Sequence, residues 1–137
     1  MSETVDREME SYFESMPFLE KIGIEEAVVE DGTAEFRVPY DPSNTNHTVV
    51  HGGVMATLVD AAVAGAIHSD AEAKLDEMEP LTIDMTVNYH APVTEGDLVA
   101  TADIVQRGRT IAVGECEIHN GGELASSGTA TYFQKWD

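Results

Sequence analysis

Residues 53–68 read GVMATLVDAAVAGAIH, a run that is apolar on almost every side when it is wound into a helix. A helix of this kind is enclosed by other elements on most of its faces, because it has no polar face to turn to water. The segment therefore predicts a long central helix with the rest of the chain wrapped around it.

The segments on either side of this helix have the two-residue period of strands. Two apolar runs surround Asp31-Gly32, a strong signal for a tight hairpin. After the helix, residues 81–89 alternate strictly between apolar and polar, so we expect the odd-numbered side chains, Leu81 and Ile83 among them, to face the core. Three more strands are expected near 97–107, 110–119 and 123–133.

The order of these elements predicts the fold class. An amphipathic helix is expected over residues 5–16, and Pro17 ends it. The later strands are consecutive and joined by short turns, so they pair antiparallel. We expect an α+β fold, a six-stranded antiparallel sheet wrapped around the long central helix with a short N-terminal helix, in a single domain over residues 1–137.

The chain carries 26 acidic and 7 basic residues, a net charge of −19. This field repels nucleic acid and anionic membrane surfaces, so neither is expected as a partner. A cationic partner, an acidic tail or adaptation to a salty cytoplasm could each explain the charge. The acids are spread through every segment, which disfavours a tail. We favour a halophilic source, because salt screens the repulsion between carboxylates.

The sequence favours a cytoplasmic location. It has no run of 18 apolar residues, and its acidic N-terminus lacks the basic start of a secretory signal. The only cysteine, Cys116, cannot form an internal disulfide, which fits a reducing compartment.

Asp60 is the only carboxylate in the apolar helix. Burying an unpaired carboxylate is costly, so such a residue is usually paired or functional; the alternative is a solvent-facing stripe on the helix. The helix begins at His51-Gly52-Gly53, where free N–H groups and the helix dipole favour an anion or a developing oxyanion. The two glycines would let a substrate carbonyl approach the backbone closely.

Together, His51-Gly52-Gly53, Leu58 and Asp60 resemble the HGG-x-x-x-x-L-x-D signature of the phenylacetyl-CoA thioesterase branch of the hotdog-fold superfamily. The resemblance extends over nearly the whole chain. It implies a hotdog fold and the hydrolysis of acyl-CoA thioesters. It also implies a homodimer, or a dimer-of-dimers tetramer, with active sites at the subunit interface.

Carried over residue by residue, the resemblance assigns Asp60 as general base or nucleophile and the Gly53 amide as oxyanion donor. His51 would orient the loop near the thioester. Thr82 would help to hold the attacking water, although the alternation of its strand directs Thr82 away from the core.

The loop before the helix departs from the family pattern. The family usually carries an asparagine six residues before the histidine, a place that Thr45 holds here, with Asn44 and Asn46 on either side. We assign the asparagine's role to Asn46.

The spacing of Gly53 and Asp60 bears on assembly. They are seven residues apart, so one helix separates them by about 10 Å. If both act on the same thioester they must come from different chains, as a two-fold pairing of central helices would provide.

Other candidate sites are weaker. Arg107 and Arg109 flank a glycine turn and could contact CoA phosphates, or be ordinary solubilising charges at a hairpin tip. His47 and His51 are four residues apart, but no HExxH pattern or nearby cysteine accompanies them, so no metal is expected. Phosphate-loop, dinucleotide and G-x-S-x-G patterns are also missing, so we expect no cofactor and no serine nucleophile.

Two other functions fit such a fold: a non-catalytic acyl-CoA-binding or interaction module, and a hydratase or dehydratase. A binding module has no need for a carboxylate within an apolar helix. The histidine and acid arrangement of the hydratases is not found in this sequence. Hydrolysis is therefore the favoured function.

The net charge predicts a stability that depends on salt. Lowering salt from 1 M to 0.1 M lengthens the screening distance from about 3 Å to about 10 Å, so repulsion among surface carboxylates grows. We expect the melting temperature, followed by circular dichroism, to drop markedly over this range. A melting temperature that stays constant would argue against adaptation to salt.

Overall fold

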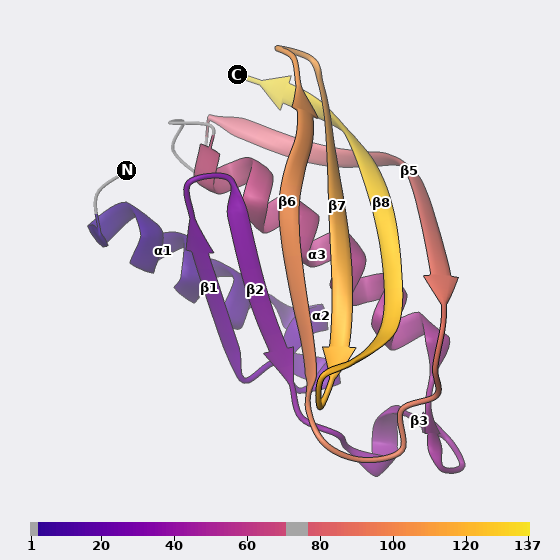
Figure 1. Cartoon of the computed structure of the whole chain (residues 1–137). Coiled ribbons are helices and arrows are strands. Elements are labelled where there is room, and N and C mark those ends of the chain that lie inside the picture. Colours follow the sequence, from indigo (N-terminus) through magenta and orange to yellow (C-terminus); the bar gives the residue numbers. More distant parts are fainter. Residues whose placement is uncertain (1–2, 71–76) are drawn as a thin grey trace.

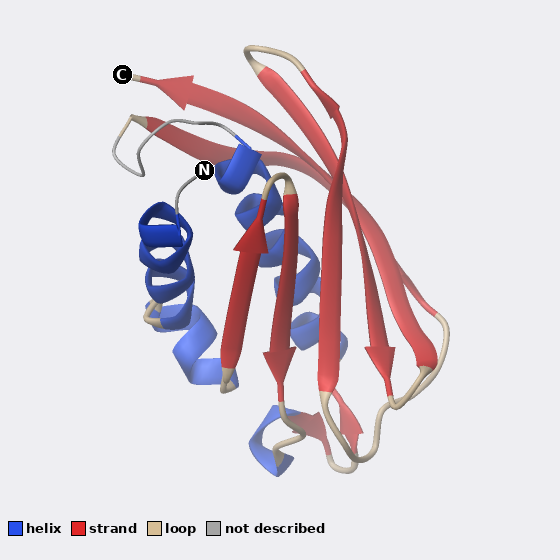
Figure 2. Ribbon diagram, turned by 60° about the vertical axis from the view of Figure 1, so that its left-hand side comes forward, coloured by secondary structure: helices blue, strands red, loops and turns tan. Residues whose placement is uncertain are grey.

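Six strands form one antiparallel sheet that curls around the long helix α3 in the computed structural model, which describes residues 3–70 and 77–137 (Figure 1). The strand order is β1-β2-β6-β7-β8-β5, so β1 and β5 are the two edges (Figure 2). The predicted fold class is confirmed. The elements are α1 (Glu3–Glu14), α2 (Pro17–Ile22), β1 (Glu26–Glu30), β2 (Thr33–Val38), the 3₁₀ turn η1 (Pro42–Asn44), β3 (Thr45–Asn46), β4 (Val49–Val50), α3 (Gly52–Asp70), β5 (Met78–Tyr89), β6 (Leu98–Arg107), β7 (Ile111–Asn120) and β8 (Glu123–Trp136).

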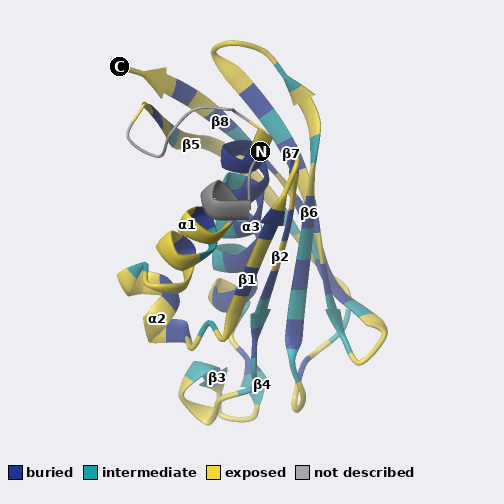
Figure 3. Ribbon diagram, turned by 90° about the vertical axis from the view of Figure 1, so that its left-hand side faces the viewer, coloured by how far each residue is buried: buried dark blue, intermediate teal, exposed yellow. Residues whose placement is uncertain are grey.

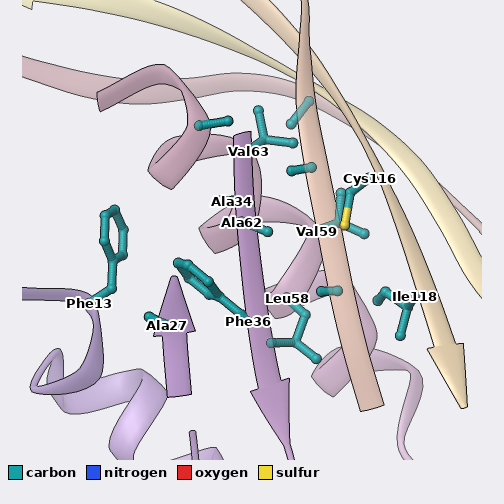
Figure 4. Packing of buried hydrophobic residues seen from close by; sticks show 14 of the residues in the cluster. Phe13, Ala27, Ala34, Phe36, Leu58, Val59, Ala62, Val63, Cys116 and Ile118 are labelled. Atoms are coloured by element: carbon teal, nitrogen blue, oxygen red, sulfur yellow. The ribbon is translucent and has the colours of Figure 1, made fainter. Parts of the chain in front are cut away.

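The centre of the core belongs to α3. Its Leu58, Val59, Ala62 and Val63 are fully buried, and Figure 4 shows them packed together with Phe36 of β2. By length and apolar composition α3 could cross a membrane, but 61% of its most apolar stretch is buried inside the fold. That burial is what a core helix requires.

Two glycines allow α3 to lie directly on the sheet. A Cβ at Gly114 of β7 would lie 2.6 Å from Val63 Cγ1. At Gly128 of β8 it would lie 3.1 Å from Val59 Cγ1 and 2.5 Å from the Thr86 carbonyl oxygen. Any larger residue at these positions would push the helix and the strands apart.

The N-terminal segment contains a helix beyond the one expected. Pro17 does not only follow α1; it begins α2, since its missing N–H and fixed φ suit the first helical position. Leu19 and Ile22 of α2 are buried, and Gly23 ends the helix with a φ of 86°.

One edge of the sheet is covered by α1. Glu14 Oε2 accepts a hydrogen bond from the Ala27 N–H at 2.9 Å, and Glu10 Oε2 accepts one from the Val29 N–H at 3.1 Å. Both N–H groups belong to β1 and would otherwise be unpaired at a sheet edge. Figure 3 shows α1 and α2 lying beside β1.

The other edge strand, β5, departs from the predicted pattern. Its register against β8 shifts between Thr82 and Asp84, which leaves Ile83 in a β-bulge. Because a bulge inserts one extra residue, the side chains before and after it exchange faces. The prediction that Leu81 and Ile83 face the core is therefore wrong: they are 39% and 57% exposed, while Thr82 points toward α3.

Arg107 of β6 holds the C-terminal end of α3. Its Nη1 donates to the Ile67 carbonyl at 3.0 Å and to Asp70 Oδ2 at 3.1 Å, and its Nη2 donates to Gln134 Oε1 at 2.8 Å. A cation at this end of a helix also interacts favourably with the helix dipole.

His68 lies in the last part of α3, 5% exposed, and neither ring nitrogen has a hydrogen bond of normal geometry. Burial lowers the pKa of His68 below its ordinary value of 6.5. A polar contact with the Met78 backbone opposes this shift, and the charge of Arg107 adds to it. The folded chain therefore holds His68 neutral.

This burial predicts a loss of stability in mild acid. The unfolded chain binds a proton at His68 more readily than the folded chain, so the contribution is present above pH 6.5 and is lost as the pH falls below it. We expect the melting temperature at constant salt to fall between about pH 7.5 and about pH 5.5, and His68→Leu to reduce that fall. An equal fall in the variant would contradict this role for His68.

Candidate active site

Asp60 lies on the flank of α3 that the sheet leaves uncovered. The half-buried positions of the helix recur every three or four residues along this flank, at Ala56, Thr57, Asp60, Ala61 and Ala64. The carboxylate is therefore at the border between the core and an open surface. It is neither enclosed in the core nor fully solvated.

Two hydroxyl groups hold the Asp60 carboxylate. Thr82 Oγ1 of β5 donates to Oδ1 at 2.8 Å. The Tyr132 hydroxyl of β8 donates to the same oxygen and to the Asp60 backbone carbonyl. Among the described residues no hydrogen bond reaches Oδ2. One carboxylate oxygen is thus anchored to the sheet, and the other is available to a bound molecule.

Tyr132 is a candidate that sequence analysis misses. The alternation of β8 shows only that it faces inward, and no motif links it to a helix residue 72 positions earlier. Burial raises the pKa of the Tyr132 phenol far above its ordinary value of 10, and the charge and hydrogen bond of Asp60 raise it further. The phenol is therefore a neutral hydrogen-bond donor at physiological pH.

An apolar cavity of about 340 Å³ opens beside Asp60. Its polar end is formed by Asp60, Thr82 and Tyr132, whereas α1 and α2 supply aromatic and aliphatic walls. A cavity of this kind suits a molecule whose polar group is attached to an apolar tail. The wall residues from the N-terminal helices are Tyr12, Phe13, Met16, Phe18 and Leu19.

His51 caps the N-terminus of α3. Its Nδ1 accepts a hydrogen bond from the Gly53 N–H at 2.8 Å, and its carbonyl oxygen accepts one from the Val54 N–H at 2.9 Å. Because Nδ1 is an acceptor, the neutral ring carries its proton on Nε2. The Gly53 amide, the expected oxyanion donor, is therefore engaged by His51 in the single chain.

Close contacts explain both glycines at the helix start. A Cβ at Gly52 would lie 3.1 Å from the Tyr89 hydroxyl, which donates to the Gly52 carbonyl at 2.8 Å. A Cβ at Gly53 would lie 3.0 Å from His51 Nδ1. Side chains at either position would displace the tyrosine or the capping histidine.

The two neighbouring asparagines have different surroundings. Asn44 Nδ2 donates to the Ile22 carbonyl at 2.7 Å, so its amide is used to hold the loop against α2. Asn46, together with His51 and Gly53, lines an open cavity of about 600 Å³ at the start of α3. Asn44 also lies beside the helix start, since it lines a second cavity of about 310 Å³ with His51 and Gly53 and its carbonyl accepts a hydrogen bond from the His51 N–H at 2.8 Å. The two asparagines thus differ in that the side-chain amide of Asn44 is engaged by α2.

The site residues expected from the sequence fall into two groups. His51, Gly53 and Asn46 line the cavity at the helix start, while Asp60 and Thr82 line the cavity near its middle. The seven helical residues from Gly53 to Asp60 span about 10 Å. A single chain therefore does not bring the two groups to one point.

The remaining candidates lie outside both cavities. The Arg107 guanidinium is engaged at the C-terminal end of α3, whereas the Arg109 guanidinium is exposed and has no hydrogen bond to a described residue. Burial raises the pKa of the Cys116 thiol to about 12, with further contributions from Glu117 and Asp103. Cys116 is therefore a thiol rather than a thiolate at neutral pH.

A curled antiparallel sheet around one helix, with a glycine-rich helix start and an anchored carboxylate in its middle, defines an enzyme of the hotdog fold. Residues 47–126 match the thioesterase superfamily, and the chain belongs to this family. It is an enzyme that hydrolyses thioesters.

Two relatives and one solved structure are similar to this chain. The chain is 36% identical to a putative esterase of Halobacterium salinarum, over 80% of this chain and 74% of the relative. It is 29% identical to the medium/long-chain acyl-CoA thioesterase YigI of Salmonella typhimurium, over 90% and 88% of the two chains. A variant of the phenylacetic acid degradation protein PaaI from Thermus thermophilus has a similar fold, with a TM-score of 0.75 and 23% identity over 86% and 98%.

The anchoring of Asp60 predicts a role for the Thr82 hydroxyl in turnover. Thr82→Val keeps the shape of the side chain and removes the donor, whereas Thr82→Ser keeps the donor. A hydrogen bond to a charged group contributes about 1.5–3 kcal/mol, so kcat for thioester hydrolysis should fall about tenfold or more in Thr82→Val and little in Thr82→Ser. Equal kcat values for these two variants would show that the hydroxyl is not needed.

Proposed function

We propose that this protein hydrolyses acyl-CoA thioesters, with Asp60 as the reacting carboxylate, in active sites shared between two copies of the chain. The observation that carries this proposal is the Asp60 carboxylate, fixed through one oxygen at the mouth of an apolar cavity. The choice of CoA thioesters is supported by the relative from Salmonella typhimurium, which is named an acyl-CoA thioesterase.

The unengaged oxygen of Asp60 starts the reaction. With Oδ1 held by Thr82 and Tyr132, Oδ2 either takes a proton from a water that attacks the thioester carbon or attacks that carbon itself. In both routes the carbonyl oxygen becomes negatively charged and the CoA thiolate leaves. In the second route water then hydrolyses the anhydride formed between the acyl group and Asp60, which releases the acid and regenerates the carboxylate. Both routes therefore need a hydrogen-bond donor facing the carbonyl oxygen.

The start of α3 supplies that donor. The Gly53 N–H donates to the neutral His51 ring in the single chain, and an oxyanion is a stronger acceptor than a neutral nitrogen. We expect the developing oxyanion to take over this N–H, aided by the positive end of the helix dipole. Asn46 lines the same cavity and orients the bound thioester.

A second copy completes the site. Within one chain the Gly53 and Asp60 groups open into different cavities, about 10 Å apart along the helix. The 12-residue strand β5 is an edge of the sheet and runs from one cavity to the other, since Thr82 lines the first and Tyr89 the second. Met85 and Tyr89 are exposed along it. A two-fold pairing along this edge brings Asp60 of one subunit toward Gly53 of the partner subunit.

The CoA phosphates need a cationic contact in so acidic a protein. Arg109 is the better placed of the two arginines named above, because its guanidinium is exposed while that of Arg107 holds the end of α3. Neither arginine lines the cavities of the single chain, so the contact requires CoA to extend beyond them.

Mixing two inactive variants tests this function and its shared site together. Asp60→Asn retains the shape of the side chain but cannot take a proton, and Gly53→Pro removes the N–H. Each should hydrolyse acyl-CoA thioesters at less than about 1% of the wild-type rate, as one oxyanion donor contributes about 10²–10³-fold. In a mixed dimer one site is intact, so refolding the two proteins together should restore part of the activity, measured as release of free CoA.

The control for this experiment is the fold of each variant. Gly53 does not have a positive φ, so proline is compatible with its backbone, but a Cβ there meets the His51 ring. His51→Ala is therefore tested as a second variant of the same half-site. Wild-type turnover by Asp60→Asn would refute the role of the carboxylate. No recovery from well-folded, demonstrably mixed dimers would refute the sharing of the site.

A further inference from the structure

The cavity beside Asp60 is long in the direction of α3. Asp60, Ala64 and His68 all line it, and they are successive residues four apart on one face of the helix. Four helical residues span about 6 Å, so Ala64 lies about 6 Å and His68 about 12 Å beyond the carboxylate. The cavity therefore follows the helix for two turns from the reacting group.

Three rings, those of His68, Tyr12 and Phe13, line the part of the cavity far from Asp60. The His68 ring lies 6.3 Å from the ring of Tyr12 and 6.0 Å from that of Phe13, measured between centroids. Because burial lowers the pKa of His68, this imidazole adds an uncharged ring to the cavity lining. Thr82 and Tyr132 lie at the Asp60 end, where both hydrogen bond to the carboxylate, and Glu79 is the other acidic residue of the lining.

We propose that this cavity takes the straight hydrocarbon tail of a medium-chain acyl group, and that Ala64 sets the length of tail that can be bound. The proposal rests on the proposed function, since the thioester carbon must lie at Asp60. A straight chain advances about 1.25 Å per carbon, so about ten carbons reach from Asp60 to the rings at the far end. A phenylacetyl group would fill only the part near Ala64.

Helices α1 and α2, which precede the sheet in the chain, also line this cavity beside Asp60, which we call the channel. Tyr12 of α1 and Phe18 of α2 line the cavity together with Ala64, and both are exposed by about half of their surface, 45% and 56%. Glu79 lines the rim of the cavity, so a tail that ends in a carboxylate would be repelled. The channel thus favours an uncharged, unbranched tail.

Substitutions at the two ends of the channel should act in opposite directions. Ala64→Leu adds bulk about 6 Å from Asp60, at a half-buried position where leucine is a good helix former. Tyr12→Ala removes a ring at the far end. The first should shorten the longest acyl group that is hydrolysed, and the second should lengthen it.

The measurement is kcat/KM for a series of straight-chain acyl-CoAs from butanoyl-CoA to tetradecanoyl-CoA, with phenylacetyl-CoA for comparison. Each buried methylene contributes about 0.8 kcal/mol, so kcat/KM in the wild type should rise about fourfold per carbon until about ten carbons. In Ala64→Leu the rise should stop near five carbons. Its value for decanoyl-CoA should then be lower by on the order of 1000-fold, because five methylenes lose their contribution, while butanoyl-CoA is hydrolysed within about twofold of the wild type.

These measurements distinguish a failure of the proposed tail-binding channel from a failure of the proposed hydrolysis. Equal losses for butanoyl-CoA and decanoyl-CoA in Ala64→Leu, or no loss for either, would overturn the role of Ala64. A higher kcat/KM of the wild type for phenylacetyl-CoA than for decanoyl-CoA would overturn the proposal that the cavity binds a straight hydrocarbon tail. If no acyl-CoA is hydrolysed, the proposed function fails, and the binding of intact decanoyl-CoA is then measured by calorimetry. Equal affinities in the wild type and Ala64→Leu would overturn the channel as well.

Discussion

The close approach of α3 to the sheet is the constraint on which the rest of this structure depends. Gly114 and Gly128 leave room for Val63 and Val59 of the helix, where any side chain on the strands would collide with them. The strands can then curl around the helix and bury one side of it completely. Since the sheet ends at β5, the opposite flank of the helix stays open, and Asp60 lies on that flank.

The carboxylate is positioned by the sheet as much as by its own helix. Thr82 and Tyr132 belong to the paired strands β5 and β8 and occupy opposite places in their register. Their hydroxyls meet one oxygen of Asp60, so the helix and two strands jointly fix the orientation of a single side chain. A carboxylate held in this way loses little freedom on reaching its reacting geometry.

The central helix, the Asp31-Gly32 hairpin and the antiparallel sheet could be predicted from the sequence, because local patterns of apolar residues and turn residues determine them. Asp31 and Gly32 both have the positive φ that such a turn needs, 40° and 84°. The bulge at Ile83 could not be predicted, since it arises from pairing with a strand about 50 residues later and leaves the alternation of β5 unchanged in the sequence.

That bulge also explains why the site was only partly predictable. The alternation of the strand directed Thr82 away from the helix, and the one-residue insertion brings it to Asp60. Tyr132 contacts the same carboxylate, but nothing in the local sequence of β8 distinguishes it from other inward residues. Motif spacing proposed Asp60 and Gly53 as site residues, yet their placement in separate cavities follows from the length of a helix rather than from the motif.

The two edge strands of the sheet differ, because β1 is covered by α1 and β5 is not. This difference limits how far the protein could assemble by pairing of strands. Glu14 and Glu10 accept hydrogen bonds from the Ala27 and Val29 N–H groups of β1, so a further strand could not pair with these groups without displacing α1. In the proposed dimer, strand addition at β5 would use the remaining edge of each chain. Growth by this route would then end at two chains, so the two carboxylates that cover β1 would also set an upper limit on the length of the shared sheet.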